Sequence, residues 1–186
     1  PRRCPLCDDI IVPYGRSICP GCETKVIYVK DPYCMKCGKQ LVAEQEYCYD
    51  CCSRKHFFTK GFVLCQYGSV QKSLFRFKYG GKREYARFYG HEMARVYGNQ
   101  ILSLGVEALV PVPLHPRKEQ KRGYNQAKLL ADSLGERLDL PVLDKLIYRV
   151  RETVPQKGLD NLQRQNNLKK AFKLSENVVK LRTIIV

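Results

Sequence analysis

Four Cys-x-x-Cys pairs near the start of the chain constrain its fold more than any other feature. The gaps between successive pairs are 11, 11 and 10 residues, and the pairs are Cys4/Cys7, Cys19/Cys22, Cys34/Cys37 and Cys48/Cys51. Such pairs are typical of zinc knuckles, in which four thiolates hold one ion tetrahedrally. A disulfide framework is the alternative. No apolar segment of the signal-peptide kind follows Arg2 and Arg3, which favours zinc.

The four pairs form an internal repeat. Residues 4–22 and 34–51 each contain a knuckle, a short apolar stretch and a second knuckle. The pattern predicts a double zinc ribbon over residues 1–59 that binds two zinc ions, which stabilise units too short to form a core. Sequential pairing is simplest, and a crossed pairing of the first pair with the third stays open. Cys52 could replace Cys51 as a ligand, although the repeat favours Cys51, and Cys65 is predicted to be a buried core thiol.

Positive charge is concentrated in the second part of the chain. Residues 60–186 hold 24 Lys and Arg against 11 Asp and Glu, whereas residues 1–59 hold 9 against 7. This excess favours a polyanionic partner such as nucleic acid or a phosphorylated molecule. Because the ribbons are nearly neutral, we expect them to dock a partner or brace the second domain. No run of about 18 apolar residues occurs, so we expect no membrane insertion and a cytoplasmic protein.

The strongest candidate for a ligand-binding segment is residues 111–127, PVPLHPRKEQKRGYNQA. They follow an apolar run at 108–110, which is predicted to be the end of a buried strand. They precede residues 127–138, in which apolar side chains recur at helical spacing. Cations cluster in this stretch, Gly123 allows close backbone approach, and the next helix offers free N–H groups. The pattern predicts a phosphate-binding loop, and a solvated basic turn is the alternative.

Strands and helices alternate over residues 60–186, the predicted second domain. We expect strands at 62–65, 108–112, 146–150, 171–174 and 183–186, and helices at 70–79, 82–104, 125–138 and within 153–167. This order predicts an α/β fold with a mainly parallel sheet and ligands at the carboxyl ends of its strands. Residues 53–60 form the predicted linker, in which His56 is an ordinary polar residue.

Several motifs resemble those of the ComF family of phosphoribosyltransferase-like proteins. The similarity covers nearly the whole chain, beginning with the paired ribbons. The other matching residues are Phe77–Gly81, Pro111–His115, Arg117, Arg122–Gln126, Thr153, Gln156, Leu159, Arg164, Asn167, Ala171 and Phe172.

The resemblance implies a type I phosphoribosyltransferase-like sheet behind a double zinc ribbon. In that family an acidic loop that binds phosphoribosyl pyrophosphate follows a strand like residues 182–186, so we expect the C-terminal part of the sheet to be missing here and this chain to be inactive. An edge strand that ends naturally is the alternative. The implied phosphate or ligand residues are His115, Arg117, Lys118, Arg122, Gly123, Tyr124, Asn125, Gln126, Lys78, Gln156 and Arg164.

For function, the resemblance implies an accessory protein of DNA uptake in natural transformation. Such a protein would bind single-stranded DNA or phosphoribosyl groups and partner the ComFA helicase-like ATPase. The alternative is a phosphoribosyltransferase that uses Mg²⁺ with phosphoribosyl pyrophosphate. A third hypothesis is that the protein serves only as an adaptor for the ATPase.

Overall fold

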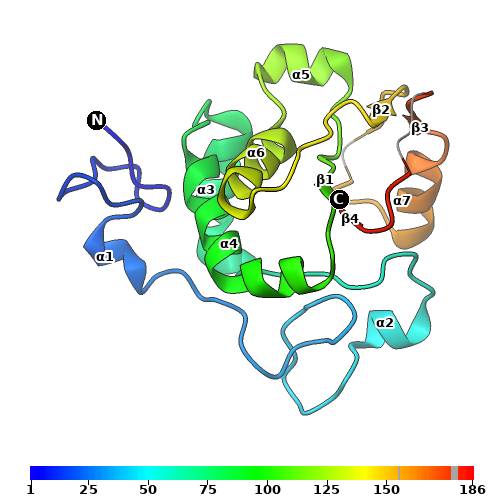
Figure 1. Ribbon diagram of the computed structural model, residues 1–186, viewed down its shortest axis with the longest axis horizontal. Coiled ribbons are helices and arrows are strands. Elements are labelled where there is room, and N and C mark those ends of the chain that lie inside the picture. Colours follow the sequence, from blue (N-terminus) through cyan, green and yellow to red (C-terminus); the bar gives the residue numbers. More distant parts are fainter. Residues whose placement is uncertain (155, 177–179) are drawn as a thin grey trace.

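The computed structural model describes residues 1–154, 156–176 and 180–186 (Figure 1). The first ribbon lies beside α3 and α4, and the second ribbon, with α2, lies below α4 in this view. The elements in chain order are α1 Pro20–Glu23, α2 Tyr49–Ser53, α3 Tyr67–Tyr79, α4 Tyr85–Ser103, β1 Ala108–Leu109, α5 Pro116–Arg122, α6 Gln126–Leu138, β2 Ile147–Arg149, α7 Asn161–Leu168, β3 Phe172–Leu174 and β4 Ile184–Ile185.

The two ribbons repeat the same backbone hydrogen bonds. The amide of Cys4 donates to the carbonyl of Asp9 at 2.8 Å, and Cys34 donates to Lys39 at 2.9 Å. The second knuckles match too, because each opens a short helix, α1 or α2, just after a cysteine. The predicted internal repeat is therefore confirmed at the level of the backbone.

The first ribbon belongs to the main core of the molecule. Its buried residues pack in one cluster with side chains of α3 and α4, where Tyr85 is fully buried. The ribbon members of the cluster are Cys4, Ile11, Ile18, Cys22 and Val26. Burial of apolar surface stabilises the folded state by roughly 25 cal/mol per Å² of surface removed from water. The first ribbon thus braces the helices, which is one of the two roles expected for the ribbons.

Helices α4 and α6 pack closely because α4 has a glycine at their contact. A Cβ at Gly90 would lie 2.4 Å from the Ser133 hydroxyl oxygen and 3.0 Å from the Ser133 carbonyl carbon. A second core cluster, centred on Ile101, Val106, Leu109 and Leu134, joins this helix pair to β1. The helices therefore hold β1, and the loop that follows it, in place.

The strands form two small sheets rather than one large parallel sheet. β1 pairs with β4 in parallel, with Leu109 opposite Ile185, and a parallel bridge joins Leu109 to Val142. β2 pairs with β3 in the antiparallel direction. The α/β class is confirmed, but only one of the two sheets in the described part of the chain is parallel.

Two local predictions were wrong. Residues 62–65 form no strand, since Cys65 makes one isolated antiparallel bridge to Tyr28. The segment pairs with the residues that follow the first ribbon instead of entering the sheet.

The predicted loop at 111–127 contains a helix, α5. The hydrophobic pattern did not indicate this helix, because it is highly charged and has no apolar face. Cys65 is half-buried against the main core, so its predicted burial holds only in part.

Most other elements occur where they were expected. The helix predicted from residue 70 begins earlier, at Tyr67, and the short helix within 153–167 is α7. The boundary between a ribbon domain and a second domain at residues 59 and 60 stays a prediction.

Candidate functional site

Eight cysteines form two groups of four with metal-binding geometry. Within each group the sulfur atoms all lie within 4.8 Å of one another. The Sγ atoms of Cys7 and Cys19 are 3.6 Å apart, and those of Cys37 and Cys48 are 3.7 Å apart. The groups are Cys4, Cys7, Cys19 and Cys22, and Cys34, Cys37, Cys48 and Cys51. The pairing is sequential, and Cys52 lies outside both groups.

One thiol in each group has a lowered pKa and loses its proton readily. Burial raises the pKa of Cys4, but backbone N–H groups, first that of Cys19, outweigh it and bring this pKa to about 7. The pKa of Cys34 falls to about 6 in the same way, with the N–H of Cys37 as the leading donor. Zinc binds thiolates, and backbone donors to sulfur favour that form.

Several of the other thiols have raised pKa values and resist ionisation without a cation. Burial raises the pKa of Cys7 to about 11, and it raises the pKa of Cys22 as well. The charge of Cys4 raises the pKa of Cys22 further. A bound Zn²⁺ neutralises this repulsion between thiolates. The donor sets therefore fit two structural zinc ions, with no position left open for substrate.

The basic loop begins where β1 ends. Val110 donates its amide to Ile185 of β4 at 2.7 Å, so residues 111–115 lie at the carboxyl end of the parallel pair. His115 precedes α5, and Gly123 ends it with φ of 80°. A Cβ at Gly123 would also lie 2.8 Å from an Arg83 guanidinium nitrogen. Glycine is required here by the local geometry, whatever the loop binds.

Two cations of α5 reach the segment after β2. Lys118 donates from Nζ to the carbonyl of Thr153 at 2.6 Å, and Arg117 lies 3.5 Å from a Glu152 carboxylate oxygen. The Arg117 side chain is still 81% exposed, so this ion pair is solvated and weak. Arg117 thus stays accessible to an anion, whereas Lys118 holds the backbone.

The other end of α5 is fixed against α3. The Arg122 guanidinium lies over the Tyr79 ring, 5.1 Å from its centroid, and donates to Gln126. Tyr124 is buried and donates its hydroxyl to the carbonyl of Phe77. Arg122, Tyr124 and Gln126 therefore position the loop through contacts within the protein.

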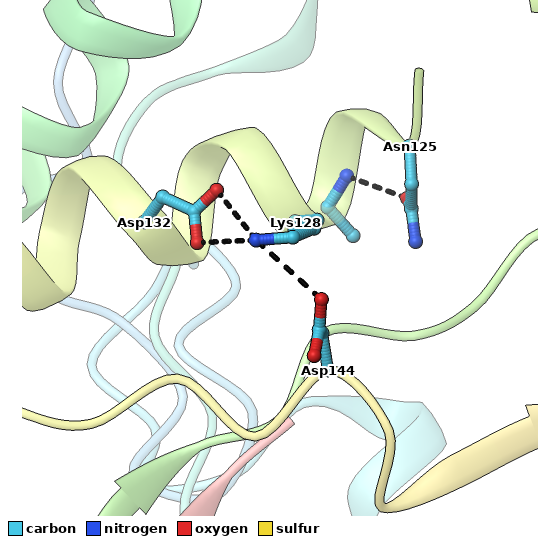
Figure 2. Close-up of polar contacts among 5 residues, drawn as sticks. Asn125, Lys128, Asp132 and Asp144 are labelled. Carbon is cyan, nitrogen blue, oxygen red and sulfur yellow. Dashed lines mark hydrogen bonds and ion pairs between the residues drawn. The ribbon is translucent and has the colours of Figure 1, made fainter. Parts of the chain in front are cut away.

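Asn125 caps the start of α6 and ties this helix to the loop. Its side-chain oxygen accepts from the amide of Ala127 at 3.0 Å (Figure 2). Its Nδ2 donates to the carbonyl of Val112 at 3.1 Å. One turn later, Lys128 lies 2.9 Å from Asp132 and 3.5 Å from Asp144. Asn125 is the cap of α6, a role that its place before a helical pattern could have indicated.

The remaining predicted residues are scattered. Lys78 lies half-buried in the last turn of α3. Among the described residues, His115 Nδ1 and Gln156 Nε2 are buried without a hydrogen-bond partner. Arg164 does not join the loop, because it lines a separate cleft with residues 54–56. Sequence reasoning missed Arg83, which lies over the Tyr124 ring and donates to the Gly123 carbonyl at 2.6 Å.

Two four-cysteine ribbons packed on a helical α/β unit define a double zinc-ribbon protein. The double zinc ribbon domain family matches residues 1–52. Competence protein F of Haemophilus influenzae is 31% identical over 178 residues, which are 93% of this chain and 76% of that protein. The chain belongs to the competence protein F family, as the sequence motifs predicted.

For two further relatives, the match covers a smaller share of the relative's length. Competence protein ComFC of Bacillus subtilis is 26% identical over 134 residues, or 68% of this chain and 55% of that protein. DNA utilization protein YhgH of Salmonella typhi is 39% identical over 80 residues, or 43% of this chain and 35% of that protein. No solved structure matches the chain. Within the described residues, every helix is too short or too polar to cross a membrane.

Proposed function

We propose that this protein acts in DNA uptake during natural transformation, as a cytoplasmic accessory protein that binds single-stranded DNA. The observation that carries the proposal is its similarity to competence protein F over 93% of the chain. The names of its relatives, competence protein and DNA utilization protein, support the same process.

Helix α5 is the proposed DNA-binding element. Four of its seven residues are Lys or Arg, and Glu119 is its single carboxylate. Arg117 and Lys121 are exposed, and both belong to one short helix beside the end of β1. Lys and Arg contacts with phosphates give affinity that is independent of base sequence and sensitive to salt.

The same loop supports an alternative function, transfer of a phosphoribosyl group. Parallel strands β1 and β4 place their carboxyl ends together, which is where ligands bind in α/β sheets. We include a type I phosphoribosyltransferase-like fold for residues 60–186 in this proposal. Phosphoribosyl pyrophosphate with Mg²⁺ would then lie near His115, whose Nδ1 has no partner in the described structure.

A helicase-like ATPase of the ComFA kind is the proposed protein partner. The second ribbon is the better docking surface, because the first is built into the core. Met35, Val42 and Tyr49 of the second ribbon are all more than half exposed. Co-purification with the ATPase should fail when Val42→Asp and Tyr49→Asp are combined. Continued co-purification of this variant, with zinc bound, would exclude this surface.

DNA binding is tested with Arg117→Gln/Lys121→Gln, which removes two exposed charges without touching the contacts of Arg122. Anisotropy of a labelled single strand should show weaker binding and a salt dependence shallower by roughly 1.4 in the log–log slope. The matched control is Lys72→Gln/Arg87→Gln, two exposed cations of α3 and α4. Equal effects of the two variants would leave only general charge attraction and reject α5.

The enzymatic alternative is tested by pyrophosphate release from phosphoribosyl pyrophosphate in the full-length protein. Release with Mg²⁺ and a nucleobase, lost in His115→Ala, would favour transfer chemistry over simple binding. No release with any common base would reject the alternative and leave the binding role.

A further inference from the structure

A second basic cleft lies away from α5, between the linker that follows the second ribbon and α7. Its volume is about 430 Å³, and it is lined by Arg54, Lys55, His56, Arg164 and Gln165. Three of these five side chains are cations, and none is an acid. Segments more than a hundred residues apart in the chain meet here, so no local sequence pattern indicates the cleft.

The cleft keeps an excess of positive charge although a carboxylate lies near it. Asp50 lies 3.8 Å from Arg54, but it also lies 3.8 Å from Lys39. It is therefore shared between two cations, and both pairs are exposed to solvent and weak. Lys55 and Arg164 make no ion pair in the described part of the molecule. The cleft is thus suited to an anion.

His56 adds an unsatisfied polar atom to the cleft. Its Nε2 is buried and has no hydrogen-bond partner among the described residues. The His56 ring packs against Phe58, with centroids 5.0 Å apart, and Lys36 Nζ lies 5.6 Å from the Phe58 centroid. Buried polar atoms are nearly always paired, so this unpaired atom marks His56 as the unusual residue of the cleft lining.

An exposed aromatic side chain lies next to these cations in the chain. Phe57 exposes 96% of its surface, and Tyr49, in the neighbouring helix α2, exposes 81%. Cations combined with exposed aromatic rings are typical of surfaces that bind single-stranded nucleic acid, because phosphates pair with the charges and bases stack on the rings. A free phosphate would need the cations but not the rings.

We propose that this cleft binds the phosphodiester backbone of single-stranded nucleic acid, with Arg54, Lys55 and Arg164 on phosphates and Phe57 stacking on a base. The inference rests on the proposed handling of single-stranded DNA and gives it a second contact site. It also assigns Arg164 to this cleft instead of to the loop at residues 111–127.

One segment of the chain connects the cleft to α5. Lys118 of α5 donates to the carbonyl of Thr153, and Asn167 of α7 donates to the carbonyl of Val154 at 2.9 Å. Asn167 belongs to the same helix as Arg164. Figure 1 shows α7 on the side of the molecule between α5 and α2. A single strand can therefore contact both basic sites along this side.

The three histidines of the chain provide a direct test. His56 reports on the cleft, His115 on the start of α5, and His91, in α4, serves as the internal reference. The full chain with zinc is titrated with a thymidine oligonucleotide of about ten nucleotides at low salt, and imidazole resonances are followed by NMR. We expect the His56 resonance to move and the His91 resonance to stay.

Variants then separate the cleft from the loop. Arg54→Gln/Arg164→Gln should abolish the His56 response, and Phe57→Ala, at an exposed position, should weaken affinity about tenfold. Lys72→Gln/Arg87→Gln is the charge-matched control, and zinc content verifies that each variant is folded.

Four outcomes are informative. Movement of His56 alone supports the cleft and rejects α5 as the DNA-binding element. Movement of His115 alone overturns the cleft and leaves the proposed function intact. No movement of either resonance overturns both. An equal His56 response to inorganic phosphate, with no effect of Phe57→Ala, shows a small-anion site and overturns the assignment to nucleic acid.

Discussion

Asp8 and Gly38 occupy equivalent positions in the two ribbons, and both have a left-handed backbone, with φ of 70° and 75°. Glycine adopts this conformation without strain, whereas aspartate tolerates it at some cost. The Asp8 carboxylate accepts from the Tyr85 hydroxyl at 2.6 Å and lies 2.8 Å from Lys82 Nζ. These contacts, with Lys82 the leading cause, hold the pKa of Asp8 below its usual range. One residue thus links the first knuckle to α4.

Replacement of Asp8 separates its contacts from its backbone strain. We expect Asp8→Ala to lower the free energy of unfolding by about 2–3 kcal/mol, since it loses two charge-assisted hydrogen bonds and keeps a left-handed φ. Asp8→Gly should be milder by about 1 kcal/mol, because glycine removes the strain. Urea unfolding with excess zinc measures both, and equal losses would show that strain plays no part.

Glu92 predicts a specific dependence of stability on pH. Burial raises its pKa, but hydrogen bonds from Arg95 and from Tyr28, the latter at 2.5 Å, lower it overall. A carboxyl whose pKa is lower when folded stabilises above its unfolded pKa, and this contribution is lost as the pH falls through the folded value. Glu92→Gln should lower stability by about 1 kcal/mol near pH 7.

The difference between Glu92→Gln and the unmodified chain should then shrink below about pH 4.5. Denaturant unfolding at a series of pH values measures this difference, and zinc release in acid affects both proteins alike. A difference that stays constant down to pH 3 would contradict the ionic role of Glu92.

At the scale of elements, α4 and α6 depend on a close contact. Gly90→Ala places a Cβ 2.4–3.0 Å from atoms of Ser133, including the Ser133 carbonyl carbon, so the helices must separate. We expect a loss of about 1–3 kcal/mol. Gly68→Ala in α3 is the control, because nothing lies within 4 Å of its added Cβ and alanine favours helix by up to about 1 kcal/mol. Thermal unfolding compares them, and equal Tm values would refute the contact.

The elements also show where sequence patterns succeed. Helices α4 and α6 were predictable because apolar residues recur along them at helical spacing and bury one face. Helix α5 was not, because its position depends on side chains that meet segments distant in sequence: Arg122 with Tyr79, and Lys118 with Thr153. Residues 62–65 look like a strand by composition, yet they pair with residues 27–29 of the ribbon exit.

At the scale of the whole molecule, the two zinc sites are unequal. Cys4 and Cys22 of the first site belong to the main core cluster with Tyr85 and Phe88. None of the four cysteines of the second site belongs to that cluster, and its knuckle meets the following segment where a Cβ at Gly38 would lie 2.9 Å from the Gly61 carbonyl oxygen. Loss of the first ion should therefore open the core, and loss of the second should affect its own ribbon.

Serine substitutions test this asymmetry. We expect Cys4→Ser to lower the free energy of unfolding by on the order of 4 kcal/mol, or about 10 °C in Tm. Cys34→Ser should lower the Tm of the helical part by less than half as much, and each variant should retain one zinc ion. Calorimetry with a zinc assay measures both. Equal losses of Tm would show that the ribbons brace the helices alike.

The sequence by itself determined the metal chemistry, the repeat, the family and the long helices of this protein. These properties depend on residue type and short spacing: thiolates two residues apart bind zinc, and apolar side chains at helical spacing bury one face. The tertiary structure decided which ribbon joins the core, where Arg164 lies and which loop cations stay accessible. These depend on contacts between distant segments, whose geometry no local pattern encodes.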